Sequence, residues 1–461
     1  MSAVNERTYL TDSMLAGIAV RPGDAGYDEV RQAWNLVIDQ RPALVVMAET
    51  AAHVAAAVRY AVDAGLPVAL QGTGHGVRRP ADGAVLINTA RMTGVHIDAT
   101  RGTAWIEAGV KWGAVLAQTQ AVGLAPLLGS SPTVGAVGYT LGGGMGWLAR
   151  RYGLAADSVL RFQVVTADGR MLDVSRDEHP DLFWALRGGG GSLALVTGME
   201  IQLYPVTTVY GGNLIYPAAL AGDVLRRFRT WVQDAPDALT SSVALMNYPP
   251  IPELPEFLRG QSVVMVRGCY AGAVDEGEAL LQPWLAWQAP MANLFHPMSF
   301  AEVATISNDP PGPLPGFASG AWLRTLSDDA IDALVRFGVN RDGSSPLIMT
   351  EVRHAGGAMR TVTEDASPIG HRDAEFVLSL VAMTPTPASQ AAAAQYVRDL
   401  KRALAPVRAG VYMNFLDAEE TQEQTADAYA AAAFDRLARV KAQYDPADRL
   451  CHGFNIPTAR A

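Results

Sequence analysis

The sequence is poor in cysteine, and it offers no cluster of metal ligands. Its 461 residues include only two cysteines, Cys269 and Cys451, which are far apart in the chain. This sparse usage is typical of reduced thiols in a cytoplasmic protein and argues against a disulfide framework. Cys451 is followed by His452, but no further ligands gather near this pair, so we expect no metal site.

Positive charge and long hydrophobic runs are also scarce. The 36 Lys and Arg residues are outnumbered by 46 Asp and Glu, which gives a formal net charge of −10. This balance argues against a nucleic-acid partner and against an anionic membrane surface. No apolar run reaches the roughly 18 residues that a membrane span needs, and residues 1–10 lack the apolar core of a secretory signal. We therefore expect a cytoplasmic protein; its oligomeric state is not indicated.

Glycine, in contrast, is plentiful, and one glycine-rich run presents a histidine. The hexapeptide Gln71-Gly72-Thr73-Gly74-His75-Gly76 follows residues 66–70, which predict a short buried strand. Glycines at alternate positions let backbone N–H groups approach a large anion, and an imidazole at the tip of such a loop can act as a nucleophile. Taken alone, the hexapeptide is explained more simply as a glycine-rich turn with a surface histidine.

Two further glycine-rich runs change that interpretation. Residues 129–147 read GSSPTVGAVGYTLGGGMGW, and residues 186–197 read LRGGGGSLALVT. In their order and spacing the three runs resemble the FAD-linked oxidases of the vanillyl-alcohol oxidase superfamily, and in particular the berberine-bridge-enzyme-like group. The resemblance extends over nearly the whole chain, from Trp34 to Asn455-Ile456-Pro457.

The resemblance implies an α+β fold with a two-part FAD-binding domain of the PCMH type and an α/β substrate domain built on a large antiparallel sheet. The expected boundaries are 1–207 and 411–461 for the two parts of the FAD domain and 208–410 for the substrate domain. Hydrophobic patterns and capping residues predict local elements independently: strands at 44–47, 66–70, 262–266 and 375–381, and helices after Thr50 and at 112–122, 390–403 and 426–443.

The resemblance also implies that FAD is held covalently through His75. Many relatives add a second link through a cysteine in a Gly-x-Cys-Pro motif, but this chain has Ser131 at that position. A hydroxyl does not form that bond readily, so we expect a single link. The implied FAD contacts are Gly72, Thr73, Gly74, Gly76, Val77, Ser131, Thr133, Val134, Gly135, Gly138, Tyr139, Gly142, Gly143, Gly144, Val196 and Asn455.

The catalytic base is the least defined part of the predicted site. At the two positions where relatives often keep a titrating group, this chain has Thr361 and Phe415, and neither side chain titrates in the usable range. We place both, with Phe376, in the substrate pocket and name Tyr139, a polar residue expected near the flavin, as the candidate catalytic residue. If residues 412–415 form a regular strand, Tyr412 faces away from Phe415.

These features predict an FAD-dependent oxidase of a small or medium organic molecule: an amine, an alcohol or a polycyclic metabolite. Dioxygen is the expected second substrate, because Val134 occupies a position where a valine accompanies oxidase behaviour in relatives. Missing catalytic bases at positions 361 and 415 suit an amine substrate, which can lose hydride without prior deprotonation. They suit equally well a cyclase or isomerase that uses FAD without net redox change, and a flavin-binding protein without turnover is a third alternative.

Overall fold

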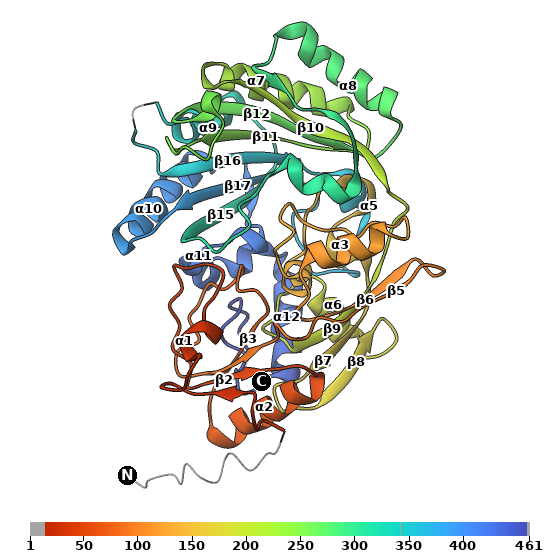
Figure 1. The fold of residues 1–461 in the computed structure, drawn as a ribbon, viewed down its shortest axis with the longest axis vertical. Helices are drawn as coiled ribbons and strands as arrows, with labels where there is room; N and C mark the ends of the chain where they lie inside the picture. Colours follow the sequence, from red (N-terminus) through yellow and green to blue (C-terminus); the bar gives the residue numbers. More distant parts are fainter. Residues whose placement is uncertain (1–13, 342, 459–461) are drawn as a thin grey trace.

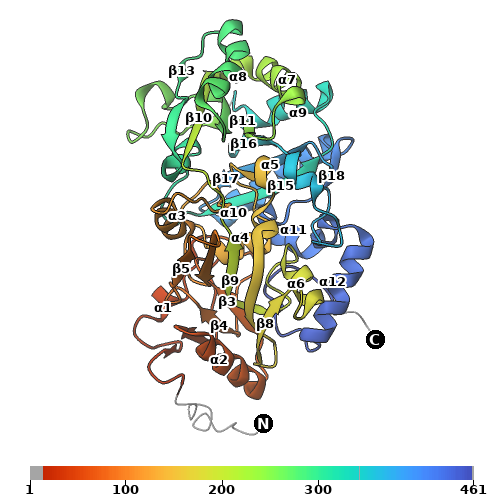
Figure 2. The same cartoon turned by 90° about the vertical axis from the view of Figure 1, so that its right-hand side faces the viewer.

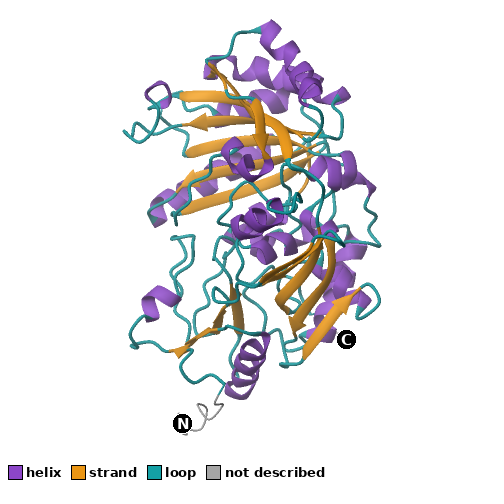
Figure 3. Ribbon diagram, turned by 45° about the vertical axis from the view of Figure 1, so that its right-hand side comes forward, coloured by secondary structure: helices purple, strands orange, loops and turns teal. Residues whose placement is uncertain are grey.

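The computed structural model describes residues 14–341 and 343–458, and in this part of the chain the strands form three sheets. A nine-stranded sheet occupies the upper half of Figure 1, and a four-stranded and a five-stranded sheet lie in the lower half. Both halves contain helices as well as strands (Figure 3), in agreement with the predicted α+β fold. None of the helices in the described ranges has the length and apolar character that a membrane crossing demands.

The four-stranded sheet has the order β1-β2-β4-β3, with β1 antiparallel and the other neighbours parallel. Its strands and the helices beside them are β1 (Ala19–Val20), α1 (Tyr27–Val30), β2 (Leu44–Met47), α2 (Ala51–Ala64), β3 (Val68–Gln71) and β4 (Val85–Asn88). The Thr50 hydroxyl caps α2 by accepting the His53 amide at 3.2 Å, as its sequence predicts. Strand β3 begins two residues later than expected, directly after Pro67, which has no N–H to donate.

The five-stranded sheet is antiparallel, with the order β5-β6-β9-β7-β8. Its strands are β5 (Val95–Asp98), β6 (Thr103–Glu107), β7 (Val159–Val165), β8 (Met171–Ser175) and β9 (Leu195–Gln202). The helices packed around it are α3 (Trp112–Gln120), α4 (Ala136–Leu141), α6 (Pro180–Leu186) and α12 (Ala431–Tyr444), whereas α5 (Ala149–Tyr152) contacts the nine-stranded sheet. Helix α12, from the end of the chain, lies beside α6 (Figure 2), and its apolar residues join the same core as this sheet.

The nine-stranded sheet is antiparallel, with the order β13-β10-β12-β11-β16-β17-β15-β18 and β14 paired to β10. Its strands are β10 (Thr208–Pro217), β11 (Leu239–Asn247), β12 (Ser262–Tyr270), β13 (Ala292–Asn293), β14 (His296–Ser299), β15 (Gly316–Leu323), β16 (Leu347–His354), β17 (Phe376–Met383) and β18 (Arg408–Gly410). The helices of this region are α7 (Ala221–Trp231), α8 (Val274–Trp287), α9 (Asp328–Gly338), α10 (Pro387–Ala403) and α11 (Ala418–Glu423).

The two faces of the nine-stranded sheet differ in chemistry. One face packs against the apolar sides of α7, α9 and α10 and forms a continuous hydrophobic core. Because side chains alternate along a strand, Val352 of β16 faces these helices, whereas its neighbours Glu351 and Arg353 face the other way, toward the lower half. The same alternation buries Phe376 of β17 among the helices, so the prediction that Phe376 lines a substrate pocket is wrong.

Candidate active site

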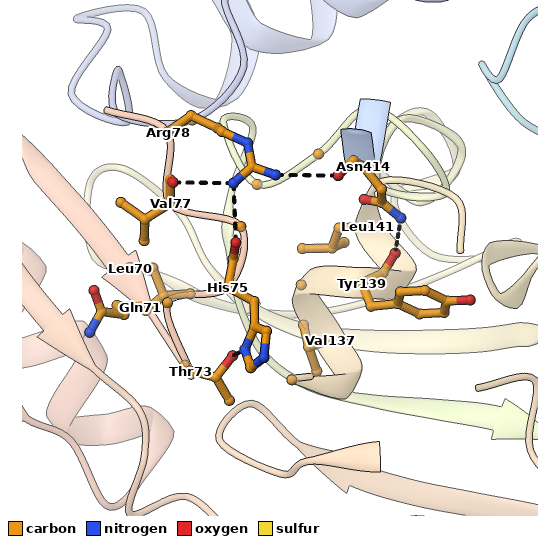
Figure 4. Close-up of a pocket in the computed structure, with 18 of the residues that line it drawn as sticks. Leu70, Gln71, Thr73, His75, Val77, Arg78, Val137, Tyr139, Leu141 and Asn414 are labelled. Atoms are coloured by element: carbon orange, nitrogen blue, oxygen red, sulfur yellow. Dashed lines mark hydrogen bonds between the residues drawn. The ribbon is translucent and has the colours of Figure 1, made fainter. Parts of the chain in front are cut away.

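A cavity of about 360 Å³ is lined by residues from all three sheets. The four-stranded sheet contributes β3 and the loop that follows it, the five-stranded sheet contributes the start of β9, and the nine-stranded sheet contributes Arg353. Helix α4 and the segments 412–415 and 452–454 complete the wall. In Figure 4, Thr73 and His75 lie on one side of this pocket, and Val137, Tyr139 and Leu141 of α4 lie on the other.

The loop after β3 is held in one shape by the segment before β2. Gly74 has a φ of 82°, and a Cβ there would lie 2.7 Å from the Ala33 Cα atom, so only glycine fits. The Trp34 amide donates to the Thr73 carbonyl at 3.2 Å, and the Trp34 indole stacks on the His75 ring with centroids 4.1 Å apart. The close approach of residues 33–34 therefore fixes the orientation of His75.

His75 is a neutral imidazole between hydroxyl groups. Its Nδ1 lies 2.9 Å from Thr73 Oγ1 and its Nε2 lies 3.3 Å from Thr133 Oγ1. Burial lowers the pKa of His75 to about 4, and the positive charges of Lys111 and Arg78 act in the same direction. An uncharged imidazole at neutral pH keeps a lone pair for nucleophilic attack. Ser131 continues the chain of hydroxyls, with its Oγ 3.0 Å from Thr133 Oγ1.

Arg78 joins the His75 loop to residues 412–416, called the tail segment below. Its guanidinium donates to the carbonyls of His75 (3.1 Å) and Val77 (3.3 Å) on its own loop (Figure 4). It also donates to the carbonyls of Asn414 (3.4 Å) and Leu416, which lie more than 330 residues away. This clamp holds the segment 412–416 against the cavity.

Tyr139 of α4 carries a buried hydroxyl that has no hydrogen-bond partner among the described residues. Its ring fits between two glycines, because a Cβ on Gly129 or Gly144 would lie 2.8 Å or 2.5 Å from ring carbons of Tyr139. Burial raises the pKa of Tyr139 well above its usual value. The phenol is therefore protonated and is poorly suited to act as a base.

Tyr412 presents a hydroxyl of a different kind. The oxygen accepts the backbone N–H groups of Gly144 at 3.1 Å and Met145 at 2.9 Å, and the Asn414 amide approaches it at 3.4 Å. Burial is the largest influence and raises the pKa of this phenol, while the Met145 amide, the Asn414 amide and the charge of Arg353 oppose part of that rise. Backbone donors aimed at one oxygen stabilise negative charge there, so Tyr412 is better placed than Tyr139 to hold and release a proton.

A buried ion cluster forms the cavity wall at the nine-stranded sheet. The Glu351 carboxylate is fully buried and accepts from Arg353 Nε at 2.7 Å, Arg267 Nη1 at 3.2 Å and Ser242 Oγ at 2.8 Å. Although burial alone would raise it, the two guanidinium groups hold the pKa of Glu351 at about 2. Of these residues, Arg353 alone reaches the cavity lining. The wall therefore exposes a fixed cation to the cavity.

The lining fits FAD. Its charged side chains are Arg78, Arg79 and Arg353, and no Asp or Glu belongs to the lining in the described part of the chain. The Arg78 cation and the backbone of its glycine-rich loop suit an anionic pyrophosphate, and the apolar majority of the lining suits a flat ring system. The unpartnered Tyr139 hydroxyl is a further polar group that a bound molecule can satisfy. His75 would hold the flavin ring end, and the loop backbone would hold the phosphates.

Most residues predicted to contact FAD lie at this cavity, and some do not. The predicted residues that line it are Gly72, Thr73, Gly74, His75, Gly76, Val77, Ser131, Val134, Gly135, Gly138, Tyr139 and Val196, together with Phe415 from the predicted substrate pocket. Thr133 lies behind this lining and reaches it through its hydrogen bond to His75.

The glycines at the end of α4 have a packing role in place of the predicted cofactor contact. A Cβ on Gly142 would lie 1.9 Å from Asn414 Oδ1, and one on Gly144 would enter the Tyr139 ring. Gly143 and Gly144 also have φ values of 107° and 81°, which side chains rarely adopt. These three glycines let α4 end against the tail segment, outside the cavity lining.

Asn455 and Thr361 also lie elsewhere than predicted. The Asn455 side chain is exposed and donates to the Gln422 carbonyl at 2.8 Å. The residues near the C-terminus that line the cavity are 452–454 instead. Thr361 is exposed at the end of a 3-10 turn and donates to the Ala358 carbonyl at 2.8 Å. Residues 413–415 form a 3-10 turn as well, so Tyr412 meets Phe415 edge to face at 4.9 Å, contrary to the alternation expected of a strand.

Sequence reasoning missed Arg353, Tyr412, Met145 and Asn414 as site residues. Arg353 and Glu351 alternate with apolar residues in the run Leu347–His354, and this pattern marks a strand with one polar face. That signal was available. No local signal marks the Tyr412 hydroxyl, because its partners lie about 267 residues away in the chain.

Comparison with known proteins agrees with this geometry. Residues 42–175 match the FAD binding domain family, and residues 411–457 match the berberine and berberine-like family. The chain is 30% identical to (R)-6-hydroxynicotine oxidase of Paenarthrobacter nicotinovorans, over 97% of this chain and 98% of the relative. It is 27% identical to glucooligosaccharide oxidase of Sarocladium strictum, over 92% of this chain and 89% of that protein.

Solved structures share the fold over almost the whole chain. The crystal structure of 6-hydroxy-D-nicotine oxidase from Arthrobacter nicotinovorans superposes with a TM-score of 0.83 at 27% identity, covering 97% of this chain and 99% of that one. Glucooligosaccharide oxidase from Acremonium strictum, described as carrying a 6-S-cysteinyl, 8α-N1-histidyl FAD, gives a TM-score of 0.82 at 23% identity, covering 96% and 97%. Together with the two family matches, these relatives show that the chain belongs to the berberine-bridge-enzyme-like group of FAD-linked oxidoreductases.

Proposed function

We propose that this enzyme oxidises an amine, an alcohol or a polycyclic metabolite of small or medium size and passes the electrons to dioxygen, which yields hydrogen peroxide. When bound, FAD supplies a flavin that accepts hydride from such a molecule. The observation that carries the proposal is the single cavity that brings the neutral His75 and the proton-holding Tyr412 together. The relatives named as oxidases of hydroxynicotine and of glucooligosaccharides support the reaction class.

We infer that His75 forms the only covalent link to FAD. Its imidazole is uncharged, oriented by Trp34 and open to the cavity, as a nucleophile must be. Ser131 lines the same cavity, but its hydroxyl is engaged with Thr133, and a hydroxyl lacks the nucleophilicity of a thiolate. With one link, FAD would be attached covalently to the protein at the His75 loop alone.

We also infer how the chain is divided between cofactor and substrate. Residues 1–207 and 411–461 would hold FAD, and residues 208–410 would hold the substrate. The core shared by α12 and the five-stranded sheet supports the first assignment, and the nine-stranded sheet with its own helical layer supports the second. Val134 lines the cavity beside His75, and its short side chain leaves room for dioxygen to reach the flavin.

A cyclase or isomerase that uses FAD without net redox change is the second candidate. It is favoured by the absence of Asp and Glu from the described cavity lining, since such a lining offers no carboxylate base for the oxidation of an alcohol. The two candidates differ in one measurement. Substrate added without oxygen should bleach the flavin of an oxidase, and air should restore its colour within seconds. A flavin that keeps its colour while product forms would support the second candidate and contradict the first.

A further inference from the structure

The ion cluster behind the cavity carries one more positive charge than it can neutralise. Arg267 and Arg353 share the single carboxylate of Glu351, and no other carboxylate forms an ion pair with either of them in the described ranges. Asp309 acts on Arg353 at longer range only, and its carboxylate already accepts the Ser130 hydroxyl at 2.6 Å. A buried charge without a counter-ion is costly, so the excess cation favours an anion that arrives from outside the cluster.

The excess charge is directed into the cavity by the geometry of Arg353. Its Nε is held by Glu351 at 2.7 Å, and its Nη1 reaches the Met145 carbonyl at 3.5 Å. Nη2 donates to no group in the described part of the chain, while the side chain as a whole lines the cavity and is 17% exposed. The guanidinium also lies 5.4 Å from the centre of the Phe415 ring. Arg353 is thus held by Glu351, Met145 and Phe415, and its Nη2 group is left to donate to a ligand in the cavity.

The surroundings of this donor edge suit the carboxylate end of a flat organic acid. Phe415 and Met145 offer apolar contact, and the Tyr412 hydroxyl, the unpartnered Tyr139 hydroxyl and Arg353 influence one another electrostatically, which places all three at the same end of the cavity. A guanidinium edge matches a carboxylate in charge and in shape.

We propose that Arg353 binds a carboxylate on the substrate, so that the site selects organic acids over their neutral analogues. The inference rests on the proposed function only in taking this cavity as the substrate site. It narrows the substrate class and makes a simple cationic amine a poor substrate, because Arg353 would repel it unless the same molecule carries an acid group.

The test is a comparison of benzoate with benzamide, two probes of nearly equal shape and different charge. Each is titrated into the flavin-loaded protein, and binding is followed by the visible flavin spectrum and, independently, by calorimetry. The wild-type protein should bind benzoate about tenfold to a hundredfold more tightly than benzamide, the range expected for a charge-assisted hydrogen bond. Arg353→Gln should reduce that ratio to near one by weakening benzoate alone.

Matched variants separate this specific role from general cavity charge. Arg79→Gln removes a second cavity-lining arginine, which donates to the Cys451 carbonyl at 2.9 Å, and should keep the benzoate preference. Arg353→Gln should fold, because Arg267 still neutralises Glu351. Arg353→Lys keeps the charge but lacks the guanidinium edge, so it should lower the ratio of benzoate to benzamide affinity without abolishing it, and a ratio unchanged in this variant would contradict the inference if the first variant does not fold.

The remaining outcomes are decisive. A wild-type ratio near one, or a ratio that Arg353→Gln leaves unchanged, would overturn the inference, and so would a variant that loses its flavin while still preferring benzoate. Air reoxidation of the reduced flavin is measured in parallel. Slow reoxidation with an intact benzoate preference would refute the oxidase and leave the anion site standing, whereas fast reoxidation without any preference would do the reverse.

Discussion

The two ends of the cavity hold their polar groups by different means. At the His75 end an uncharged ring stands among hydroxyls and backbone amides, and most of its partners come from two short stretches, 33–34 and 73–78. At the Arg353 end a cation, a phenol and a fully buried carboxylate are assembled from four distant segments around residues 139–145, 267, 351–353 and 412–415.

This difference indicates a division of labour. At the His75 end, glycines allow the backbone to approach a ligand closely, and hydroxyl groups line the site. These features suit a cofactor that stays bound and keeps one shape. The Arg353 end concentrates charge in a low-dielectric wall, where the loss of one partner is costly and a matching ligand is favoured. The first end is suited to retention of a cofactor and the second to selection of a substrate.

The largest expected effect is the loss of covalent flavin in His75→Ala. The variant loses the imidazole that Trp34 orients toward the cavity, and Ser131 offers a hydroxyl only. After acid precipitation the flavin of this variant should be found in the supernatant. Thr73→Val is the control, because it removes one hydrogen bond to His75 and leaves the nucleophile. Covalent flavin that survives in His75→Ala would remove the distinction drawn between the two ends.

Glu351→Gln tests the charged end by its stability. The change leaves Arg267 and Arg353 buried without their shared counter-ion, and we expect the free energy of unfolding to fall by about 3–5 kcal/mol. Urea denaturation measures it. The control is Asp399→Asn, which breaks the exposed pair with Arg402 and should cost less than about 1 kcal/mol. Equal losses in the two variants would show that the cluster is not a special feature of the cavity wall.

Tyr412→Phe tests which phenol holds the proton. Removing the hydroxyl that Gly144 and Met145 support should slow flavin reduction by about a hundredfold, the scale of a lost general acid or base. Tyr139→Phe should change the rate by less than about tenfold, because among the described residues no backbone donor supports its hydroxyl. Anaerobic stopped-flow reduction by any substrate that bleaches the flavin gives both rates. The opposite ranking would transfer the role to Tyr139.

The smallest expected effect concerns dioxygen at the His75 end. Val134→Ile adds one methylene beside the flavin site and should slow air reoxidation of the reduced flavin several-fold. Because the change adds no charge or hydrogen-bonding group, the ratio of benzoate to benzamide affinity should stay as in the wild type. A large change in that ratio would show that the two ends are not independent.

The local parts of this molecule are those that sequence reasoning predicts. The alternating glycines around His75, the Thr50 cap of α2 and the strand Leu44–Met47 depend on neighbouring residues, so the sequence indicates them directly. The family resemblance adds the global fold, which the relatives confirm. The single link through His75 and the catalytic role of a tyrosine remain predictions.

The parts that sequence reasoning misplaced depend on contacts between distant segments. Gly142–Gly144 resemble a cofactor loop, but Gly142 is required by the close approach of Asn414 and Gly144 by that of the Tyr139 ring, which no local pattern shows. Phe376 is a plausible pocket residue until the sheet register assigns it to the helix-covered face. Asn455 turns outward because the Gln422 carbonyl is within reach.

The central claim, one covalent link through His75 in a retained FAD, is tested most directly by mapping flavin-bearing peptides of the wild-type protein. After acid precipitation and protease digestion, flavin absorbance should travel with one peptide, the one that contains His75, at close to one flavin per chain. Flavin attached to the peptide that contains Ser131, or free FAD in the acid supernatant, would contradict the account.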